Sequence, residues 1–298
     1  MASQNDVISV IVSFNDVRNT HKAVSTLLNQ TVRTKIVVWD NNSSDNTLAI
    51  LKKDFDNEII IHESKENCYW TPAINESIRK YYDGEKYIHW SNNDIAYPER
   101  SLERLILDIN ETKAGMVGPT GSAIGGLQDY AVHQRHLDGD FINFSTLYAF
   151  LGSKKPTQAS SIQGACVLVS SESFNKVGFL DENMPLGADD FDYSIRMKDA
   201  GYGLFVSEKA YVFHKGHASG PGNEKQWDDI GSKSWDFFNE KYEGYYFNEL
   251  EALRCMWEHK YYLGWDTGTG WLSEEDRLLT WNKRGVRYDG SPIHSSES

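Results

Sequence analysis

The sequence lacks a run of about 18 apolar residues, so it predicts no transmembrane helix. The stretch from Met1 to Asp6 is polar and contains no signal-peptide core. Positive charge is also scarce, because 30 Lys and Arg stand against 43 Asp and Glu, which gives a formal net charge of −13. A protein this acidic does not offer the basic surface that phosphate backbones require, so we expect no nucleic-acid partner.

Cysteine is rare. The 3 cysteines, Cys68, Cys166 and Cys255, are odd in number and far apart in the chain. This pattern favours buried thiols in a reducing compartment over a disulfide set or a metal cluster. We therefore expect a cytoplasmic protein, at most bound peripherally at the inner face of the membrane.

A glycine-rich phosphate loop is missing as well. The first strand-like run, 7–13, ends in Ser13-Phe14-Asn15-Asp16 in place of G-x-G-x-x-G. This absence argues against a nicotinamide enzyme, and against a nucleotidyltransferase that holds phosphates in such a loop.

The chain contains enough apolar residues, 40% of the total, to bury a core. Strand-like and helix-like segments alternate through the first half, which predicts an α/β fold with a mostly parallel sheet. The predicted strands are 7–13, 35–40, 58–62, 87–91, 162–170, 204–206 and 211–214. The predicted helices begin at Asn19 or Thr20, at Asp45, at Thr71-Pro72, at Ser101 and at Asp189.

The last part of the chain, 220–298, has a different composition and predicts a mostly helical extension. It is rich in tryptophan, with Trp227, Trp235, Trp257, Trp265, Trp271 and Trp281. Aromatic residues at helical spacing usually form a core, and we favour that interpretation. The alternative is that some of these rings bind a sugar, whose C–H faces pack on aromatic side chains.

Polar residues follow the predicted strands at the edge where an open parallel sheet binds ligands. Asp40 comes directly after an apolar strand, and Ser91-Asn92-Asn93-Asp94 follows the strand 87–91. Such residues also form Asx-turns and helix caps, and a cap is the better explanation for Asp45.

Five short segments of the sequence, taken together and in their order along the chain, form a recognisable set of motifs. They are SVIVSFN at 9–15, VVWDNNSSDNT at 37–47, SNND at 91–94, ADDFDYSIRMKDAGY at 188–202 and VFHKGH at 212–217. In these segments the sequence resembles the family-2 glycosyltransferases, from Val7 to about His217. The resemblance implies a GT-A fold, which is a Rossmann-like nucleotide-binding mixed sheet with flanking helices. It implies a GT-A domain over 1–219, with a nucleotide-sugar part, 1–115, and an acceptor and catalytic part, 116–219.

The resemblance also implies roles for individual residues. Asp40 would read a uracil or thymine ring, and Mg²⁺ or Mn²⁺ would rest on Asp94 and His214, with Asn92 as a further ligand. Hard cations take oxygen ligands, and Mn²⁺ also accepts imidazole. The nucleotide-binding residues would be Ser13, Phe14, Asn15, Asp40, Asn67, Asn92 and Asn93. Cys68, Tyr69 and Trp70 stand where the family has small residues, so we expect a narrowed sugar pocket.

The same resemblance places the catalytic base at Asp190. Asp189 and Arg196 would support it, although acidic residues also favour a helix N-terminus and Arg196 could equally brace Asp192. The acceptor-binding residues would be Gly164, Ala165 and Trp227.

We therefore expect an inverting transferase that moves a sugar from a UDP- or dTDP-sugar to a hydroxyl of a saccharide or lipid-linked saccharide. The predicted setting is the synthesis of a bacterial surface polysaccharide. Other possibilities are a sugar-nucleotide hydrolase or nucleotidyltransferase, and an inactive carbohydrate-binding or nucleotide-sugar-binding module.

Overall fold

The computed structural model of the chain describes residues 6–122, 124, 128, 155–159, 161–216 and 224–242. Its strands are β1 (Val7–Ser13), β2 (Thr34–Asp40), β3 (Ile60–Glu63), β4 (Tyr87–Asn92), β5 (Ile95–Ala96), β6 (Met116–Gly121), β7 (Thr157–Gln158), β8 (Cys166–Ser170) and β9 (Leu204–His214). Its helices are α1 (Val17–Leu28), α2 (Thr47–Phe55), α3 (Trp70–Tyr81), α4 (Ser101–Thr112), α6 (Ser171–Val177), α7 (Asp189–Asp199) and α8 (Glu224–Lys241).

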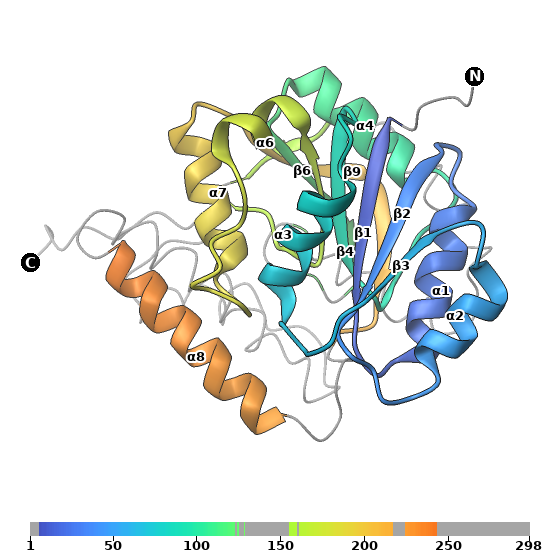
Figure 1. Cartoon of the computed structure of the whole chain (residues 1–298). Helices are drawn as coiled ribbons and strands as arrows, with labels where there is room; N and C mark the ends of the chain where they lie inside the picture. The colour runs from blue at the N-terminus through green and yellow to red at the C-terminus, as the bar shows by residue number, and fades with distance from the viewer. Residues whose placement is uncertain are drawn as a thin grey trace, which may run out of the picture. The chain divides into compact units, whose positions relative to one another are not determined.

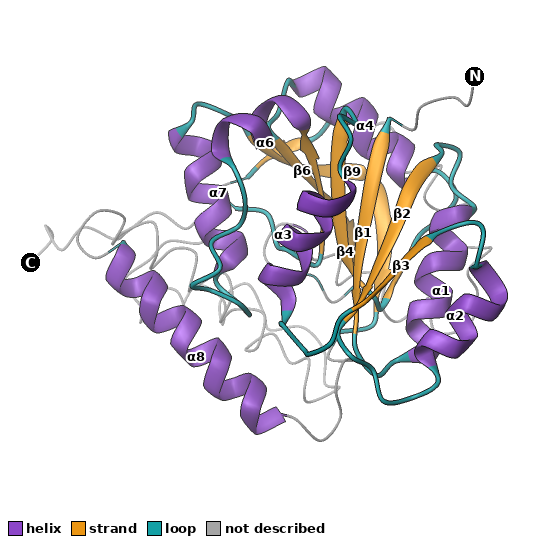
Figure 2. Cartoon of the chain, in the orientation of Figure 1, coloured by secondary structure: helices purple, strands orange, loops and turns teal. Residues whose placement is uncertain are grey.

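The strands form one mixed sheet in the order β3-β2-β1-β4-β8-β6-β9-β5, with β7 paired to β9 (Figure 2). The strands β3, β2, β1 and β4 are parallel, whereas β8 runs antiparallel to both β4 and β6. The predicted α/β class is confirmed. The parallel half gathers the carboxyl ends of β1, β2 and β4 at one edge, where open sheets bind ligands.

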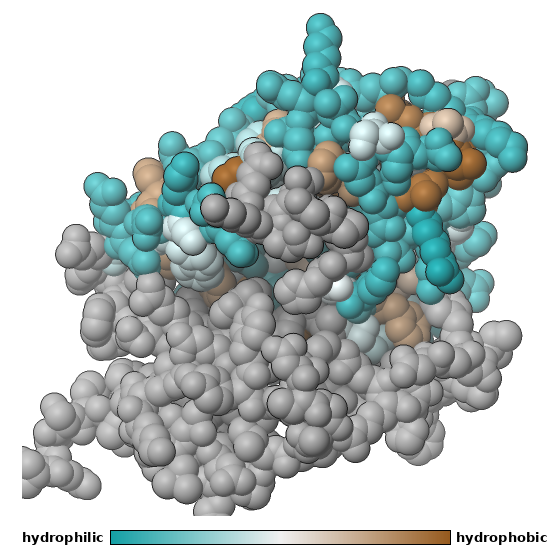
Figure 3. Space-filling view, turned by 90° about the horizontal axis from the view of Figure 1, so that it is seen from below, coloured by the Kyte–Doolittle hydropathy of each residue, from teal (hydrophilic) through white to brown (hydrophobic). Residues whose placement is uncertain are grey.

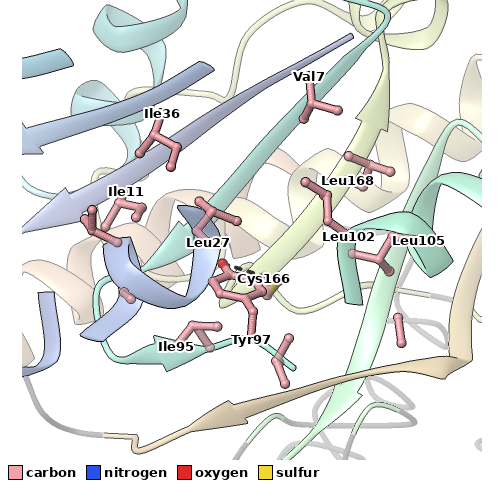
Figure 4. Packing of buried hydrophobic residues seen from close by; sticks show 14 of the residues in the cluster. Val7, Ile11, Leu27, Ile36, Ile95, Tyr97, Leu102, Leu105, Cys166 and Leu168 are labelled. Atoms are coloured by element: carbon pink, nitrogen blue, oxygen red, sulfur yellow. Dashed lines mark hydrogen bonds between the residues drawn. The ribbon is translucent and has the colours of Figure 1, made fainter. Parts of the chain in front are cut away.

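Helices cover both faces of the sheet because alternate strand residues point to opposite sides. Val7 and Ile11 of β1 belong to one buried cluster, with side chains of α1, α2 and α4. Ile8 and Val10 belong to the other, with side chains of α3, α6 and α7. Figure 1 shows α3 and α7 together on one face, and Figure 4 shows residues of the first cluster, including Leu27, packed between sheet and helices.

Some predicted boundaries were wrong. Asp16 caps α1, because its carboxylate accepts the N–H of Asn19 at 3.3 Å, while the Thr20 hydroxyl donates back to the Asp16 carbonyl. The helix α2 begins at Thr47, whose N–H donates to Asp45 at 2.9 Å.

Two further boundaries differ from the prediction. The helix α3 begins at Trp70, because the hydroxyl of Thr71 bonds to the carbonyl of Met184 and not to its own helix. The predicted strands 204–206 and 211–214 form one strand, β9, whose register with β6 shifts between Pro119 and Thr120.

The chain divides into two compact units, Met1–Phe237 and Phe238–Ser298. The predicted boundary near residue 220 stays a prediction, and the extension beyond residue 242, with Trp257, Trp265, Trp271 and Trp281, lies outside the described residues. No helix among the described residues is long and apolar enough to cross a bilayer. The described surface in the view of Figure 3 is mainly hydrophilic. Among all described residues, Leu107 is the one large apolar residue that is exposed.

Candidate active site

The turns that follow β1 and β2 are bonded to each other. Asn15 adopts a left-handed backbone with φ of 49°, which asparagine tolerates. Its side-chain oxygen accepts the N–H of Ser44 at 2.7 Å, and its own N–H donates to the Ser43 hydroxyl at 3.0 Å. The buried hydroxyl of Ser13 bonds to that of Thr20 at 2.9 Å. Ser13 and Asn15, both predicted to bind nucleotide, therefore build the framework of this edge.

Asp40 ends β2 with a fully buried carboxylate. Its Oδ2 accepts the N–H of Ser43 at 2.8 Å, while Oδ1 has no hydrogen-bond partner among the described residues. Burial raises the pKa of this carboxyl above its ordinary value. A buried polar oxygen without a partner is unfavourable unless a ligand supplies the donor. Asp40 is thus suited to accept an N–H of a bound base.

The loop before α3 is bonded to the end of β2. The side chain of Asn67 accepts the N–H of Tyr69 at 2.9 Å, and Asn41 donates its side-chain N–H to the Tyr69 carbonyl at 2.9 Å. Tyr69 has φ of 65° and ψ of −156°, a conformation that costs a non-glycine residue about 1–3 kcal/mol. The predicted nucleotide-binding residue Asn67 therefore holds a strained loop next to Asp40.

Asn92, Asp94 and His214 converge on one point. Nε2 of His214 lies 3.1 Å from the side-chain nitrogen of Asn92 and 3.2 Å from Oδ1 of Asp94. The β5–β9 pairing, which sets Ile95 opposite His214, brings the histidine to this place across the sequence. Ser122 fixes the histidine backbone by bonding to both its N–H and its carbonyl at 3.0 Å.

This cluster fits a divalent cation. The nitrogen Nε2 of His214 cannot donate to Asp94 and accept from Asn92 at once, and the orientation of an asparagine amide is an assignment. If the Asn92 amide is rotated by 180°, its oxygen and Oδ1 of Asp94 both face Nε2 of His214. In an octahedral complex with bonds of about 2.1 Å, neighbouring ligand atoms are about 3.0 Å apart, which is close to these separations. The described residues contain no group of three or more His, Cys, Asp or Glu side chains around a metal position, so Asn92 would have to take part.

Asn93 lies differently from its neighbours. Its side chain is buried and donates to the Thr20 hydroxyl at 3.0 Å, on the α1 side of the sheet. Of the two predicted nucleotide-binding residues in this segment, Asn92 belongs to the cluster with Asp94 and His214. Asn93 instead stabilises the turn from the α1 side.

Asp190 stands at the start of α7 with both carboxylate oxygens bonded. Oδ2 accepts the N–H of Gly164 at 3.0 Å, and Oδ1 accepts the N–H of Phe191 at 2.9 Å. Burial raises the pKa of Asp190 to about 6, against the opposing effect of these bonds. Each oxygen keeps a lone pair, so a partly exposed carboxylate of this kind can take a proton at neutral pH.

Asp189 is more deeply buried than Asp190. Burial, together with the neighbouring Asp190 charge, raises its pKa well above the ordinary value. The residues before it, Gly187 and Ala188, have φ of 82° and 63°, so the turn into α7 is left-handed. Alanine is strained in this region, and the strained turn presents both carboxylates at the helix start.

Asp190 and the cluster of Asn92, Asp94 and His214 are adjacent. The N–H of Asn92 donates to the carbonyl of Ala165 at 2.9 Å, and Gly164, the preceding residue, bonds to Asp190. A Cβ at position 164 would lie 3.8 Å from Oδ2 of Asp190 and 3.9 Å from Oδ2 of Asp189. Glycine therefore leaves open the space beside both carboxylates that a side chain would occupy.

Arg196 braces α7. Its Nε donates to Oδ2 of Asp192 at 2.7 Å and its Nη1 to the Val177 carbonyl at 3.2 Å. Asp192 is fully buried, and the guanidinium lies over the Tyr193 ring at 4.9 Å. Of the two roles left open for Arg196, these contacts match the structural one.

The structure gives the tryptophans of α8 distinct places. The ring of Trp227 is 6.3 Å from that of Phe14, in the turn after β1. Trp235 lies 5.4 Å from Phe191, and its Nε1 would be 3.8 Å from a Cβ at Gly187. The ring beside the Asp190 loop is thus Trp235. The tryptophan-rich composition pointed to it, but its position in the sequence did not distinguish it from Trp227.

Other residues of the site carried no usable signal in the sequence. Asn41 and Ser43 belong to the strand-end segment, yet their bonds to Tyr69 and Asp40 depend on the fold. Ser122 is distant from His214 in the chain, and no motif marks it.

Similar folds occur in solved structures. A mannosyltransferase from Pyrobaculum calidifontis, in complex with GDP-Man and Mn²⁺, matches with a TM-score of 0.57 and 14% identity, covering 80% of this chain and 64% of that one. GalNAc-T7 with UDP, GalNAc and Mn²⁺ matches with a TM-score of 0.56 and 13% identity, covering 85% and 54%. TarS 1-349 of S. aureus matches with a TM-score of 0.50 and 14% identity, covering 85% and 76%. The chain spans less than two thirds of the first two proteins.

These likenesses establish the fold as GT-A. No curated protein matches the sequence. The model of the family described as Glycosyl transferase family 2 matches residues 9–178, more than half of the chain, including most of β1, Asp40 and the Asn92–Asp94 segment. The chain therefore belongs to glycosyl transferase family 2.

Proposed function

We propose that the protein transfers a sugar, with inversion, from a UDP- or dTDP-sugar to a hydroxyl of a saccharide or lipid-linked saccharide. The observation that supports this most is the adjacency of the Asn92–Asp94–His214 cluster and the Asp190 carboxylate, joined through Gly164 and Ala165. Sugar transfer needs a cation site for the diphosphate and a carboxylate for the incoming hydroxyl. The two must lie close enough to act on the same nucleotide-sugar molecule.

The nucleotide part of the donor would bind at the edge formed by β1, β2 and β4. Oδ1 of Asp40 would accept the ring N–H of uracil or thymine, which would give this buried oxygen its partner. The turn held by Asn15 would line the ribose, and Phe14 would border the base together with Trp227.

Asp94 and His214, with the amide of Asn92, would hold Mg²⁺ or Mn²⁺. When bound, the cation neutralises the charge that develops on the diphosphate leaving group. The solved mannosyltransferase and GalNAc-T7 contain Mn²⁺, which supports a divalent metal for this chain.

Asp190 would act as the base. As the acceptor oxygen bonds to the anomeric carbon and the bond from that carbon to the diphosphate oxygen breaks, Oδ1 or Oδ2 takes the hydroxyl proton. Because attack occurs opposite the leaving group, the configuration inverts. Gly164 and Ala165 would leave room for the acceptor, and Asp189 would keep the proton affinity of Asp190 high.

The domain assignment is part of this proposal. Residues 1–115 would bind the nucleotide sugar, 116–219 would carry the base and the acceptor side, and 220–298 would form a helical extension. We place the enzyme in the cytoplasm or peripherally at the inner membrane face, in the synthesis of a bacterial surface polysaccharide. Its net charge of −13 opposes strong adsorption to anionic lipid, so a lipid-linked acceptor would provide any membrane contact.

Nucleotide release tests the proposal. The chain is incubated with UDP-, dTDP- and GDP-sugars and Mn²⁺, with and without a panel of saccharide acceptors, and free nucleotide is measured. Acceptor-dependent release from a UDP- or dTDP-sugar, with an inverted anomeric centre in the product by NMR, is the expected result. Equal release without acceptor would indicate a hydrolase, and binding without release from any donor would indicate an inactive binding module.

A further inference from the structure

Tyr69 has the least favourable backbone conformation of the described residues that surround the site. The non-glycine residues with positive φ are Asn15, Asn42, Tyr69, Lys113 and Ala188. Asparagine visits this region readily, whereas a bulky residue rarely does. The ψ of −156° at Tyr69 places it in a region that is essentially restricted to glycine.

Hydrogen bonds on both sides hold this conformation. In addition to the bonds from Asn67 and Asn41, the N–H groups of Trp70 and Thr71 both donate to the Pro185 carbonyl, at 3.0 and 3.1 Å. All of these bonds use backbone groups of residues 69–71, so a glycine at position 69 would keep them without strain. The backbone alone therefore does not explain a tyrosine here.

The backbone bonds of residues 69–71 place this loop between the segments that carry Asp40 and Asp190. Asn41, bonded to its carbonyl, directly follows Asp40, which is proposed to read the base. Pro185, bonded to the next two residues, leads into the turn that carries Asp190. The donor sugar has to lie between the nucleobase and the catalytic base, and Tyr69 is half-buried along that stretch.

We propose that the side chain of Tyr69 packs against the sugar of the nucleotide donor and determines which sugar is accepted. This rests on the proposed function and adds a specificity residue to it. A phenol ring covers the C–H face of a pyranose, and its hydroxyl bonds to a sugar hydroxyl. The strained backbone would be retained because it sets the direction in which the ring leaves the chain, and the adjacent hydrogen bonds hold that backbone conformation.

Calorimetry on Tyr69→Gly and Tyr69→Ala tests the proposal. UDP, UDP-glucose, UDP-N-acetylglucosamine, dTDP and dTDP-glucose are titrated in the presence of Mn²⁺ into the parent and both variants. We expect unchanged affinity for free UDP or dTDP, and an affinity for the preferred nucleotide sugar that is about tenfold weaker in both variants. Tyr69→Phe should keep the packing and change only the ranking of the sugars.

Thermal unfolding separates the ring from the backbone. Tyr69→Gly should raise the midpoint by about 2 °C or more because it relieves strain, whereas Tyr69→Ala should not. Lys113→Gly is the matched control: it relieves a left-handed residue at the end of α4, with φ of 55°, and should raise the midpoint without changing any affinity.

The outcomes are distinct. The inference is wrong if Tyr69→Gly binds nucleotide and nucleotide sugar as the parent does, if it loses both equally, or if Tyr69→Ala keeps the parent's affinity for the sugar. A parent that binds none of these nucleotides or nucleotide sugars would instead refute the proposed function.

Discussion

Gly164 donates its backbone N–H to Oδ2 of Asp190 at 3.0 Å, and a Cβ at position 164 would lie 3.4 Å from Cβ of Asp190. The glycine orients the carboxylate without covering it. This bond favours the ionised form, while burial opposes ionisation and raises the pKa to about 6. The result is a carboxylate that is mostly ionised at neutral pH and still basic enough to take a proton.

Asp190→Asn should lower transfer about 10²–10⁴-fold, because the amide keeps the size of the side chain but cannot accept a proton at neutral pH. The affinity for UDP or dTDP should not change, since the base faces the acceptor. Initial rates at saturating donor, together with calorimetric titration of the nucleotide, check both statements.

Asp189→Asn is the control for this prediction. Burial raises the pKa of Asp189 well above its ordinary value, so replacing it with an uncharged amide should disturb the site less and the loss should be smaller. Inactivity of Asp189→Asn combined with an active Asp190→Asn would assign the base to Asp189.

The pH dependence follows from the raised pKa of Asp190. Transfer should decline as pH falls through about 6, because the base becomes protonated. The folded pKa lies above the ordinary value of 3.8, so this carboxyl lowers the stability of the parent as pH rises from about 4 to about 6. Urea unfolding across this range should show Asp190→Asn gaining stability relative to the parent. A difference that is constant with pH would mean that the carboxyl titrates normally.

The sheet was predictable from the sequence because its strands are buried on both faces and alternate with helices. The runs 7–13 and 87–91 are apolar and end in polar turns, so their assignment as strands followed from the local pattern. The helix starts were less predictable, since several Asn, Asp, Ser and Thr residues compete for each cap. Tertiary bonds decided between them, as when Thr71 bonded to Met184.

The roles of the site residues stay predictions, although the sequence does show why these residues were chosen. Asp40, Asp94 and Asp190 follow from strand ends, a helix start and the family motifs. The role of Ser122 does not, because its bonds to His214 depend on the β6–β9 pairing. The strain at Tyr69 is also invisible in the sequence, because residue identity does not reveal φ and ψ.

Removing the cation ligands should weaken donor binding unequally. Asp94→Ala removes the charged oxygen, and binding of UDP or dTDP with Mn²⁺ should fall to the level seen in EDTA. His214→Ala should have a smaller effect, because imidazole is a softer ligand that hard cations can replace with water. Calorimetry with and without EDTA measures this. Affinity in the parent that is the same with and without EDTA would contradict a role for metal.

Arg196→Met should destabilise the fold and leave the chemistry intact. Asp192 is fully buried, and breaking a buried ion pair typically costs about 3–5 kcal/mol. Because the side chain of Arg196 is 23% exposed, we expect the lower end of that range. Urea unfolding gives the loss, and kcat at low temperature should match the parent.

The double variant Asp192→Leu with Arg196→Met is the control, and it should regain stability because no buried charge remains unpaired. A fall in kcat without a loss of stability in Arg196→Met would give the arginine a direct role in transfer.

Asp40→Ala should weaken binding of UDP or dTDP by about 1–3 kcal/mol, because the ring N–H of the base would lose its buried acceptor. Asp45→Ala is the matched control in the same turn: this carboxylate is exposed and bonds to the N–H of Thr47 at 2.9 Å, so its loss should not change nucleotide affinity. Calorimetry compares both variants with the parent, and circular dichroism confirms that each is folded. Oδ1 of Asp40 has no donor among the described residues, so it is available to the N–H of a ligand. If Asp40→Ala binds as tightly as Asp45→Ala, the carboxylate of Asp40 serves the turn through Ser43 and does not read the base.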